Sequence, residues 1–544
     1  VDLNRRRVIP GLNDSHLHVI RGGLYYNLEL RWDGVPTIAQ ALMQLKEQAD
    51  RTPPPQWVRV VGGWNEWQFK DGRMPSIDEI NAAAPDTPVF VMHLYDSAIL
   101  NRAALSALGF SKRTPNPPGG LVARDRDGTP SGLLIAEPNA LVLYSAIAKA
   151  PKLGADDQRN SSRHFMRELN RFGVTSVSDA GGGGQNYPDD YKIIKSLHDE
   201  NQLTLRIAYS LFAQKPGKEL DDYTRWIGMT NPGTGSDFLQ VNGAGENLLW
   251  AAADFENFLQ PRPDLKPAME SELETIVHTL ADANWPWRIH ATYDETISRF
   301  LDVFERVHND RPINNLGWFL DHGETISRKN LERVQRLGGG LAIQHRMAYQ
   351  GEYFVRRYGV EQAKARPPIR QMLEMGLPVG GGTDGTRVAS YHPWTSIWWM
   401  VSGKTVGGTV LHDKGDRLSR KEALERFTVG SAWFSREQGK KGKLSPGYYA
   451  DLAVLDADYF DIEEDEIRRL ESILTIVGGR IVHGQNEFKP FDPPLPPASP
   501  NWSPTEHFRG YDNSSPIPHK HDHEHTPIMG ADGRVWETGC GCGV

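Results

Sequence analysis

Short apolar runs alternate with helical patterns along most of this chain, and this alternation limits the possible folds more than any other feature. The first run lies at residues 8–18, and seven more follow at 173–179, 203–212, 237–241, 287–290, 316–322, 340–345 and 377–384. Helical patterns lie between them at 156–171, 270–283, 295–307, 328–337 and 369–375. Strands that alternate with helices form parallel βα units. The sequence therefore predicts an α/β protein with a (β/α)8 TIM-like barrel at residues 8–435.

The stretch between the first two runs is too long for a simple crossover helix. A helix is expected at 37–49, and apolar segments at 57–61 and 88–94 are followed by turns rich in glycine and proline. We therefore predict an inserted lobe at about residues 50–140, which would lie over the site. Residues 488–544 are rich in proline and poor in aromatic residues, as in segments that do not build a core of their own.

Metal-ligating residue types recur where the predicted strands end, which is where the chemistry of such barrels is placed. His16 and His18 are two residues apart, so in a strand they face the same side. His290, His322 and Asp384 end the fifth, sixth and eighth runs. Each alone has a structural explanation, such as a histidine bonded to a backbone carbonyl or an aspartate that caps a helix. Together they favour one shared metal site.

The segment PGLNDSHLH at 10–18, with His290, DHGE at 321–324, GGTDG at 381–385 and GKLSPGYYADLAVLD at 442–456, resembles the amidohydrolase superfamily. It is most similar to amidohydrolase family 3, which includes N-substituted formamide deformylases. The resemblance covers residues 8–485. It implies a distorted barrel with one or two divalent metal ions and a small β-sandwich. Residues 1–7 and 436–487 would form a remnant of that sandwich, with strands at 443–455 and 474–483.

Two-metal members of this superfamily need a bridging carboxylate, often a carboxylated lysine of the fourth strand. The fourth run here has no lysine. We place Glu137, in SGLLIAEPNA, in the ligand set with His16, His18, His290, His322 and Asp384. Glu246 is the alternative bridge, and Glu137 could instead be a solvated acid at the start of a helix. Imidazole and carboxylate ligands with an open position favour zinc, one ion or two, although iron or manganese fits the same ligands.

The expected chemistry follows from these residue types. The metal would acidify water and polarise a carbonyl, while Asp384 would take the proton and pass it to the leaving nitrogen. His322 or His345, at the end of the seventh run, could hold the oxyanion, and a structural role fits His345 equally well.

We predict hydrolysis of a carbon–nitrogen bond in a non-peptide amide, with an N-substituted formamide as the concrete case. The alternatives are an ester, a cyclic amide or a deamination on the same scaffold, or a catalytically silent metal-binding protein. Asp384 argues against the silent protein, since a metal holder needs no base.

Aromatic residues gather around the expected mouth of the site. They are Trp64, Trp67 and Tyr95 in the lobe, and Trp394, Trp398 and Trp399 after Asp384. If Trp64, Tyr95 and Trp394 line the pocket with His345, an apolar or aromatic N-substituent would fit, whereas packing in the core is the structural explanation. Arg346 and Arg387 could bind a carboxylate or form structural ion pairs.

The net charge of −8 has no basic stripe in it, so nucleic acid and anionic membrane are poor candidates for partners. A small-molecule amide is the expected partner, and a homodimer is possible. No apolar run is long enough to span a membrane, and no signal peptide is recognisable, so we expect a soluble, cytoplasmic protein. The chain opens on Val1 instead of Met, which leaves export open. The histidines at 519–525, with Cys540 and Cys542, could bind metal or belong to a hydrophilic extension.

Overall fold

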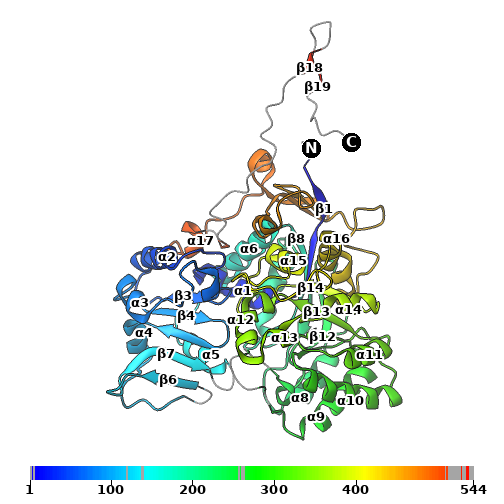
Figure 1. Cartoon of the computed structure of the whole chain (residues 1–544), viewed down its shortest axis with the longest axis horizontal. Helices are drawn as coiled ribbons and strands as arrows, with labels where there is room; N and C mark the ends of the chain where they lie inside the picture. Colours follow the sequence, from blue (N-terminus) through cyan, green and yellow to red (C-terminus); the bar gives the residue numbers. More distant parts are fainter. Residues whose placement is uncertain are drawn as a thin grey trace.

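The eight predicted strands form two parallel four-stranded sheets. A computed structural model describes residues 3, 6–117, 120–136, 140–254, 258, 262, 264–508, 510–511, 528–529 and 535–537 (Figure 1). In the order β10-β9-β8-β2, the first sheet contains β2 (Leu12–Leu17), β8 (Val174–Asp179), β9 (Arg206–Leu211) and β10 (Leu239–Ala244). In the order β11-β12-β13-β14, the second contains β11 (Arg288–Ala291), β12 (Phe319–His322), β13 (Gly340–Gln344) and β14 (Val379–Gly382). All these strands overlap the predicted runs.

The two sheets adjoin each other at both edges. Beyond β14, the backbone N–H groups of Thr383 and Asp384 donate to the carbonyl of His16, with N–O distances of 3.2 and 2.8 Å. At the other edge, Ala244 forms an isolated parallel bridge with Trp287. A Cβ atom at Gly382 would lie 2.7 Å from the backbone nitrogen of His16, so this close approach requires glycine. The observed architecture is thus a pair of sheets with helices, without one continuous ladder around all eight strands.

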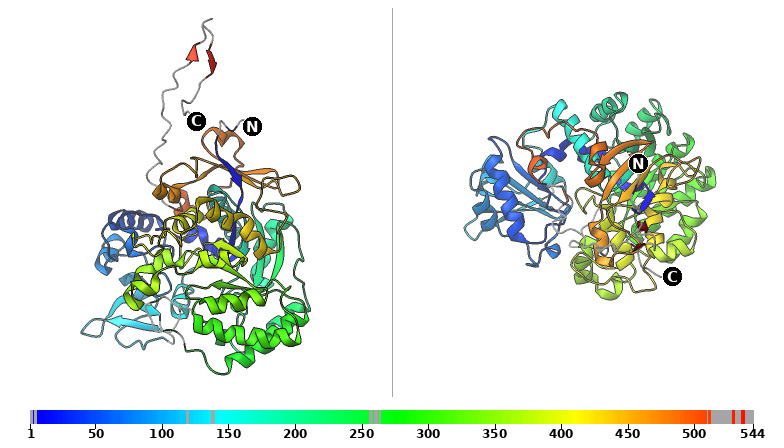
Figure 2. Two further views of the ribbon diagram at one scale, coloured as in Figure 1. Left: turned by 45° about the vertical axis from the view of Figure 1, so that its right-hand side comes forward. Right: turned by 90° about the horizontal axis from the view of Figure 1, so that it is seen from above.

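The helices between these strands also match the sequence pattern. They include α6 (Ala155–Arg171), α7 (Lys192–Asp199), α8 (Glu219–Ile227), α9 (Met269–Asp282), α10 (Asp294–Asp310), α11 (Arg328–Arg336), α12 (Arg346–Tyr358) and α14 (Ile369–Glu374). Helices α8 to α11 lie on the outer side of the sheets (Figures 1 and 2). The Ser327 side chain accepts a hydrogen bond from the backbone N–H of Asn330 and so caps α11. Apolar faces of the helices, such as Leu331 and Val334, pack into the main core.

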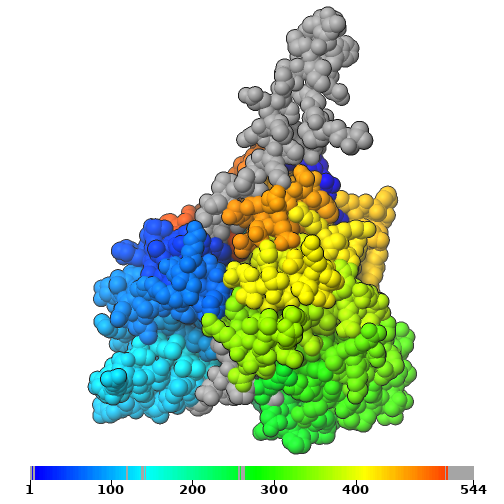
Figure 3. All heavy atoms as spheres, in the orientation of Figure 1, coloured from blue at the N-terminus to red at the C-terminus, as the bar shows by residue number. Residues whose placement is uncertain are grey.

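A separate mixed sheet lies within the residues where the sequence predicts a lobe. Its order is β3-β4-β5-β7-β6, built from β3 (Val58–Val61), β4 (Val89–His93), β5 (Ser97–Leu100), β6 (Gly120–Arg124) and β7 (Pro130–Ala136). Helices α2 (Ile38–Arg51), α3 (Ile77–Ala83), α4 (Arg102–Ala107) and α5 (Leu141–Ile147) accompany it. Two hydrophobic clusters belong to this region. In Figure 3 it forms the blue and cyan block beside the green and yellow one.

The first predicted strand is divided between two sheets. Val8–Pro10 (β1) pairs antiparallel with β15 (Leu452–Leu455), and the parallel strand β2 begins only at Leu12. A Cβ atom at Gly11 would lie 2.2 Å from the Thr175 side chain, so glycine allows the chain to cross there. Including β1 in the barrel was therefore wrong.

The expected β-sandwich is a single sheet in the described part of the chain. Its order is β1-β15-β16-β17, with β16 (Ser472–Val477) and β17 (Arg480–Gly484). It is anchored to the main body by Thr475, whose Oγ1 donates to the carbonyl of Asn170 at the end of α6, at 2.7 Å. Phe488 packs with Val454 and Leu474 in a small core. The strands β15 and β16 need no second sheet, because α6 and Phe488 already cover apolar residues.

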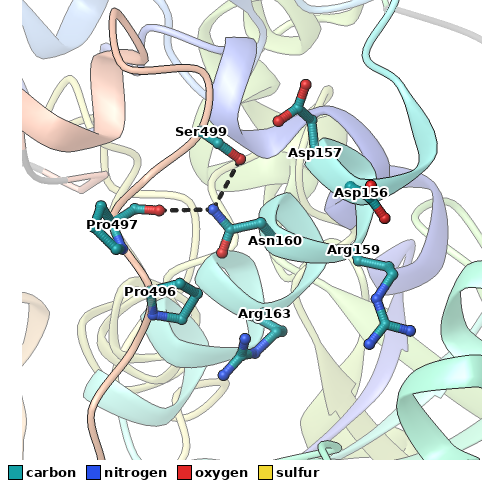
Figure 4. A pocket seen from close by; sticks show the side chains of 8 residues that line it. All are labelled: Asp156, Asp157, Arg159, Asn160, Arg163, Pro496, Pro497 and Ser499. Carbon is teal, nitrogen blue, oxygen red and sulfur yellow. Dashed lines mark hydrogen bonds between the residues drawn. The ribbon is translucent and has the colours of Figure 1, made fainter.

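Residues 496–508, which we call the strap, run across the surface of α6 and reach α2. Asn160 Nδ2 donates to Pro497 O at 2.8 Å and to Ser499 Oγ at 3.0 Å (Figure 4), and Gln48 Nε2 donates to Trp502 O at 2.8 Å. An open hollow of about 290 Å³ lies between α6 and the strap. Part of the predicted tail is therefore ordered against the body of the protein. The histidines at 519–525, with Cys540 and Cys542, fall outside the described residues.

Within the described ranges, no helix is both long enough and apolar enough to span a bilayer.

Candidate active site

Strand ends from both parallel sheets bring six ligand-type side chains into one buried cluster. Each of them is at most 5% exposed. The cluster consists of His16 and His18 from the end of β2, Glu246 after β10, His290 in β11, His322 at the end of β12 and Asp384 after β14. These are the residues that the sequence pattern brings together, with Glu246 as the additional carboxylate. Glu137 falls in one of the gaps between the described ranges.

The Glu246 carboxylate lies between two pairs of histidines. Its Oε1 is 2.7 Å from His290 Nδ1 and 3.1 Å from His322 Nε2. Its Oε2 is 3.6 Å from His16 Nε2 and 3.7 Å from His18 Nε2. One oxygen thus faces each pair, which is the arrangement that a bridging carboxylate needs.

Asp384 completes the cluster on the side of β2. Its Oδ1 lies 3.2 Å from His18 Nε2 and 3.4 Å from His16 Nε2, while Arg346 Nη2 donates to Oδ2 at 3.2 Å. Two groups, His16–His18–Asp384 and His16–Glu246–His322, have their ligand atoms within 4.8 Å of one another. Such spacing can hold metal ions. Asp384 and His322 also have left-handed backbone angles, φ 54° and 77°, and such strain is concentrated at functional sites.

Buried partners fix which nitrogen of each β2 histidine faces the cluster. His16 Nδ1 is 2.8 Å from Asp321 Oδ1, and Arg288 Nε donates to Asp321 Oδ2 at 2.8 Å. Because a carboxylate only accepts, the contact with Asp321 places a hydrogen on Nδ1, and in the neutral imidazole Nε2 then presents its lone pair to the cluster. His18 Nδ1 likewise bonds the carbonyl of Gly181. Among the described residues, His16 Nε2 and His322 Nδ1 are buried without a hydrogen-bond partner, which suits metal ligands.

The electrostatics of the cluster favour a bound cation. Burial alone would lower the pKa of His16, but the carboxylates of Asp321, Asp384 and Glu246 raise it to about 9. A positive charge is therefore stabilised at this place, and a metal ion could supply it. Burial and the Arg346 charge lower the pKa of His322 to about 3, so its imidazole is neutral as a metal ligand must be.

Both cluster carboxylates are held in the ionised form. Burial by itself would raise the pKa of Asp384, but the positive charge of His16 and the close approach of His16 and His18 hold it well below its ordinary value. Burial would also raise the pKa of Glu246. The charge of His16 and the hydrogen bonds from His290 and His322 outweigh burial and lower this pKa well below its ordinary value. The residues present thus match the charge and the donor atoms of a divalent metal site.

Comparison with known proteins decides the family. The family described as "Amidohydrolase family" matches residues 1–483. The chain belongs to the amidohydrolase family. This confirms the resemblance found in the sequence and the prediction of an amidohydrolase-type hydrolase.

Two relatives match this amidohydrolase over most of their length. It is 24% identical to YtcJ of Bacillus subtilis, over 89% of this chain and 90% of the relative. It is also 24% identical to the N-substituted formamide deformylase of Arthrobacter pascens, over 88% of this chain and 89% of the relative. A solved structure, an uncharacterized metal-dependent hydrolase from Pyrococcus horikoshii, aligns with a TM-score of 0.61 and 22% identity, covering 86% of this chain and 89% of that one. The amidohydrolase shares its fold with that protein.

Two of the predicted substrate residues lie in hydrophobic cores. Trp64 is fully buried against Trp32 and Phe69, and its indole N–H donates to Met92 O at 3.1 Å. Trp394 is also fully buried, and its indole donates to Phe172 O at 3.0 Å. Their polar atoms and ring faces are occupied by the protein. We therefore leave both out of the substrate site of this amidohydrolase.

The other two predicted substrate residues lie nearer to Asp384. His345 is fully buried at the start of α12. Burial lowers its pKa to about 3, opposed by the charge of Asp384. Tyr95, in the turn after β4, is half-buried beside Tyr144 and Arg21.

Sequence reasoning missed the residues that support the cluster. Arg288 and Asp321 stand in the strand runs WRIH and FLDH, where all neighbours are apolar or ligands. A charged residue inside a buried strand must be paired, and that signal could have found them. Arg346 was expected either to bind a carboxylate or to form an ion pair. It donates to Asp384 and lies 3.7 Å from Glu324, so it is part of an ion-pair network.

Proposed function

We propose that this member of the amidohydrolase family hydrolyses the carbon–nitrogen bond of a small non-peptide amide. This proposal rests on Glu246, which lies between two pairs of histidines, and on Asp384, which lies beside one of these pairs. The name of the relative from Arthrobacter pascens makes N-substituted formamides the concrete candidates. The site suits them because a formamide carbonyl needs little room between the buried ligands.

We propose zinc as the metal, since neutral imidazoles with carboxylates are its usual ligands in hydrolases. His16, His18 and Asp384 would hold one ion and His290 with His322 a second, with Glu246 shared between them. Iron or manganese would fit the same donors. A bound divalent ion supplies Lewis acidity, which lowers the pKa of water and polarises a carbonyl.

The side chains around this site divide the remaining work. Asp384 is ionised and accepts the proton of the attacking water, then returns it to the leaving nitrogen. Arg346 donates to Asp384 Oδ2 and so fixes the direction of the carboxylate. His345 is neutral and buried nearby, and its N–H could donate to the carbonyl oxygen as negative charge develops.

We also infer that the two parallel sheets are halves of one distorted (β/α)8 barrel. The hydrogen bonds from Thr383 and Asp384 to His16, and the bridge from Ala244 to Trp287, support closure at both edges. In this division, residues 50–140 are an inserted lobe and residues 436–487 a small accessory domain. The cluster then lies at the C-terminal ends of the barrel strands, where (β/α)8 enzymes carry out their chemistry.

A substrate screen with controlled metal content tests the function. The full-length protein is stripped with a chelator, reloaded with zinc and assayed on formamides, other simple amides, esters and lactams. Zinc-dependent hydrolysis of formamides or amides supports the proposal. Activity on esters or lactams alone would favour the alternative reactions, and tight zinc binding without any turnover would favour a metal-binding protein.

A further inference from the structure

In the described part of the chain, three arginines near the loop after Asp384 lie close to two carboxylates, those of Glu29 and Asp33. Arg31 Nη1 donates to Glu29 Oε2 at 2.8 Å, and its Nε donates to Asp33 Oδ2 at 2.9 Å, so both carboxylates already have a partner. Arg387 is only 8% exposed and lies 3.8 Å from the other oxygen of Glu29. Burial lowers the pKa of Arg59 to about 10, and the charge of Arg387 adds to this effect against the attraction of Glu29. Among the described residues, the guanidinium groups of Arg31, Arg59 and Arg387 thus share the carboxylates of Glu29 and Asp33.

Two donor atoms of the Arg387 guanidinium are unpaired in the part of the chain that the structure describes. Its Nε and Nη1 atoms are buried and have no hydrogen-bond partner among the described residues. A buried cation with unused N–H groups is costly, because the lost hydration is not replaced. Such a group is stabilised when an anion binds to it. Arg387 follows Asp384 by three residues, so the same loop carries both the proposed base and these donors.

Arg21 and two tyrosines stand beside this loop. Arg21, three residues after His18, donates from Nη2 to the Tyr95 hydroxyl at 3.4 Å. The Tyr144 hydroxyl donates to the same oxygen at 3.0 Å, and the Arg387 guanidinium carbon lies 5.6 Å from the centre of the Tyr144 ring. Because Tyr95 accepts both bonds, its own O–H remains able to donate. Arg21, Tyr95 and Tyr144 are half-buried, so part of each side chain is exposed to solvent.

We propose that Arg21, Arg387 and Tyr95 bind an anionic oxygen group of the substrate, so that the natural substrates are amides with an acidic group. This inference rests on the proposed amide hydrolysis and names its substrate class. Two guanidinium groups and a phenol match a carboxylate or a phosphate, because these groups accept several charge-assisted hydrogen bonds at once. An uncharged formamide would leave the Arg387 donors unpaired. Residues near both His18 and Asp384 would thus align the amide with the cluster.

Binding of unreactive anions tests the site without turnover. Calorimetry compares benzoate, phenylphosphonate and benzyl alcohol on the metal-free full-length protein, which separates binding at the arginines from binding to a metal ion. We expect one of the two anions to bind at least roughly tenfold more tightly than the alcohol, and Arg387→Gln to remove that preference. The preferred anion tells carboxylate from phosphate. Equal binding of all three compounds, or unchanged anion binding by Arg387→Gln, would overturn the anion site.

Two matched substrates test the consequence for catalysis. N-formylphenylalanine and N-formyl-2-phenylethylamine differ only in the carboxylate, and the zinc-loaded protein should favour the acid by roughly ten- to hundredfold in kcat/KM. Arg387→Gln and Arg21→Gln should reduce this ratio, and Arg387→Lys should keep part of it. Arg328→Gln, an exposed arginine paired with Glu332 on α11, is the matched control. If Arg387→Gln does not fold by circular dichroism, Arg21→Gln and Tyr95→Phe carry the test.

The two measurements separate this inference from the proposed function. If the protein hydrolyses the neutral formamide but Arg387→Gln does not change anion binding, the anion site is overturned and amide hydrolysis stays in place. Anion binding that depends on Arg387, with no hydrolysis of any amide, would overturn the hydrolysis and with it the substrate class.

Discussion

His16 Nδ1 lies 2.8 Å from Asp321 Oδ1, and both side chains are completely buried. This bond selects the tautomer in which His16 presents Nε2 to the cluster. We predict that Asp321→Asn, whose amide lacks the negative charge, weakens zinc affinity by about 10- to 100-fold. Competition with a chromophoric chelator measures the change. Asp302→Asn, at an exposed site on α10, is the control, and equal affinities of the two variants would contradict the role of Asp321.

Glu246 should determine how many ions the protein holds. A neutral amide is a poor bridge between two cations, so Glu246→Gln should lower the metal content by about one ion per chain. Elemental analysis of the purified protein after zinc reconstitution measures it. Glu137→Gln is the comparison, because Glu137 is the other carboxylate that the sequence offers. Loss of metal in Glu137→Gln, with full content in Glu246→Gln, would reverse the assignment.

Asp384 should matter far more for turnover than its surface counterparts. As the group that moves the proton, its replacement in Asp384→Asn should reduce kcat by about 10²- to 10⁴-fold. Asp282→Asn removes an exposed aspartate that pairs with Arg311 and should leave kcat unchanged. Both rates are measured with the best formamide or amide from the screen. A loss of less than about threefold in Asp384→Asn would show that another group moves the proton.

His483, on β17, should make stability depend on pH. It is 5% exposed, and burial together with Arg167 lowers its pKa from 6.5 to about 3 in the folded protein. Between these values the unfolded chain binds a proton that the folded protein does not, so stability falls as the pH falls below 6.5. The contribution of His483 alone to the loss between pH 7.5 and pH 5.5 should be about 1.4 kcal/mol. Urea unfolding at the two pH values measures the loss of stability. This loss should be smaller in His483→Asn than in the unmodified protein, and an equal loss in both proteins would show that His483 is not its cause.

The regular elements could be predicted because they depend on local pattern. Strand runs such as 174–179 and helices such as 294–310 carry their periodicity in the sequence. The division of the first strand at Gly11 could not be predicted in the same way. It depends on the approach of Thr175, which is distant in sequence. The contact between the two sheets likewise depends on hydrogen bonds from Thr383 and Asp384 to His16, not on local propensity.

The candidate site was predicted where a residue type and a strand end coincide. His290 and His322 stand at the ends of short runs, so their convergence follows from the topology. Glu246 lies five residues beyond the predicted end of its run, and β10 in fact continues to Ala244, so its position was undecided. Whether Trp64 lines a pocket or packs in a core depends on which side of a sheet its segment packs against. An excess of aromatic residues in the sequence does not reveal that side.

The strap is synthesised late, and it contacts segments near the beginning of the chain. Asn27, just after α1, donates to Ser499 O at 2.9 Å and accepts from Ser503 Oγ through its own carbonyl at 2.6 Å. Gln48 and Asn160 bind the same segment. Residues near position 500 leave the ribosome long after those near position 30, so the early helices wait for partners that are made last. Asn27, Gln48 and Asn160 therefore acquire these contacts only when translation has passed the last parallel strand.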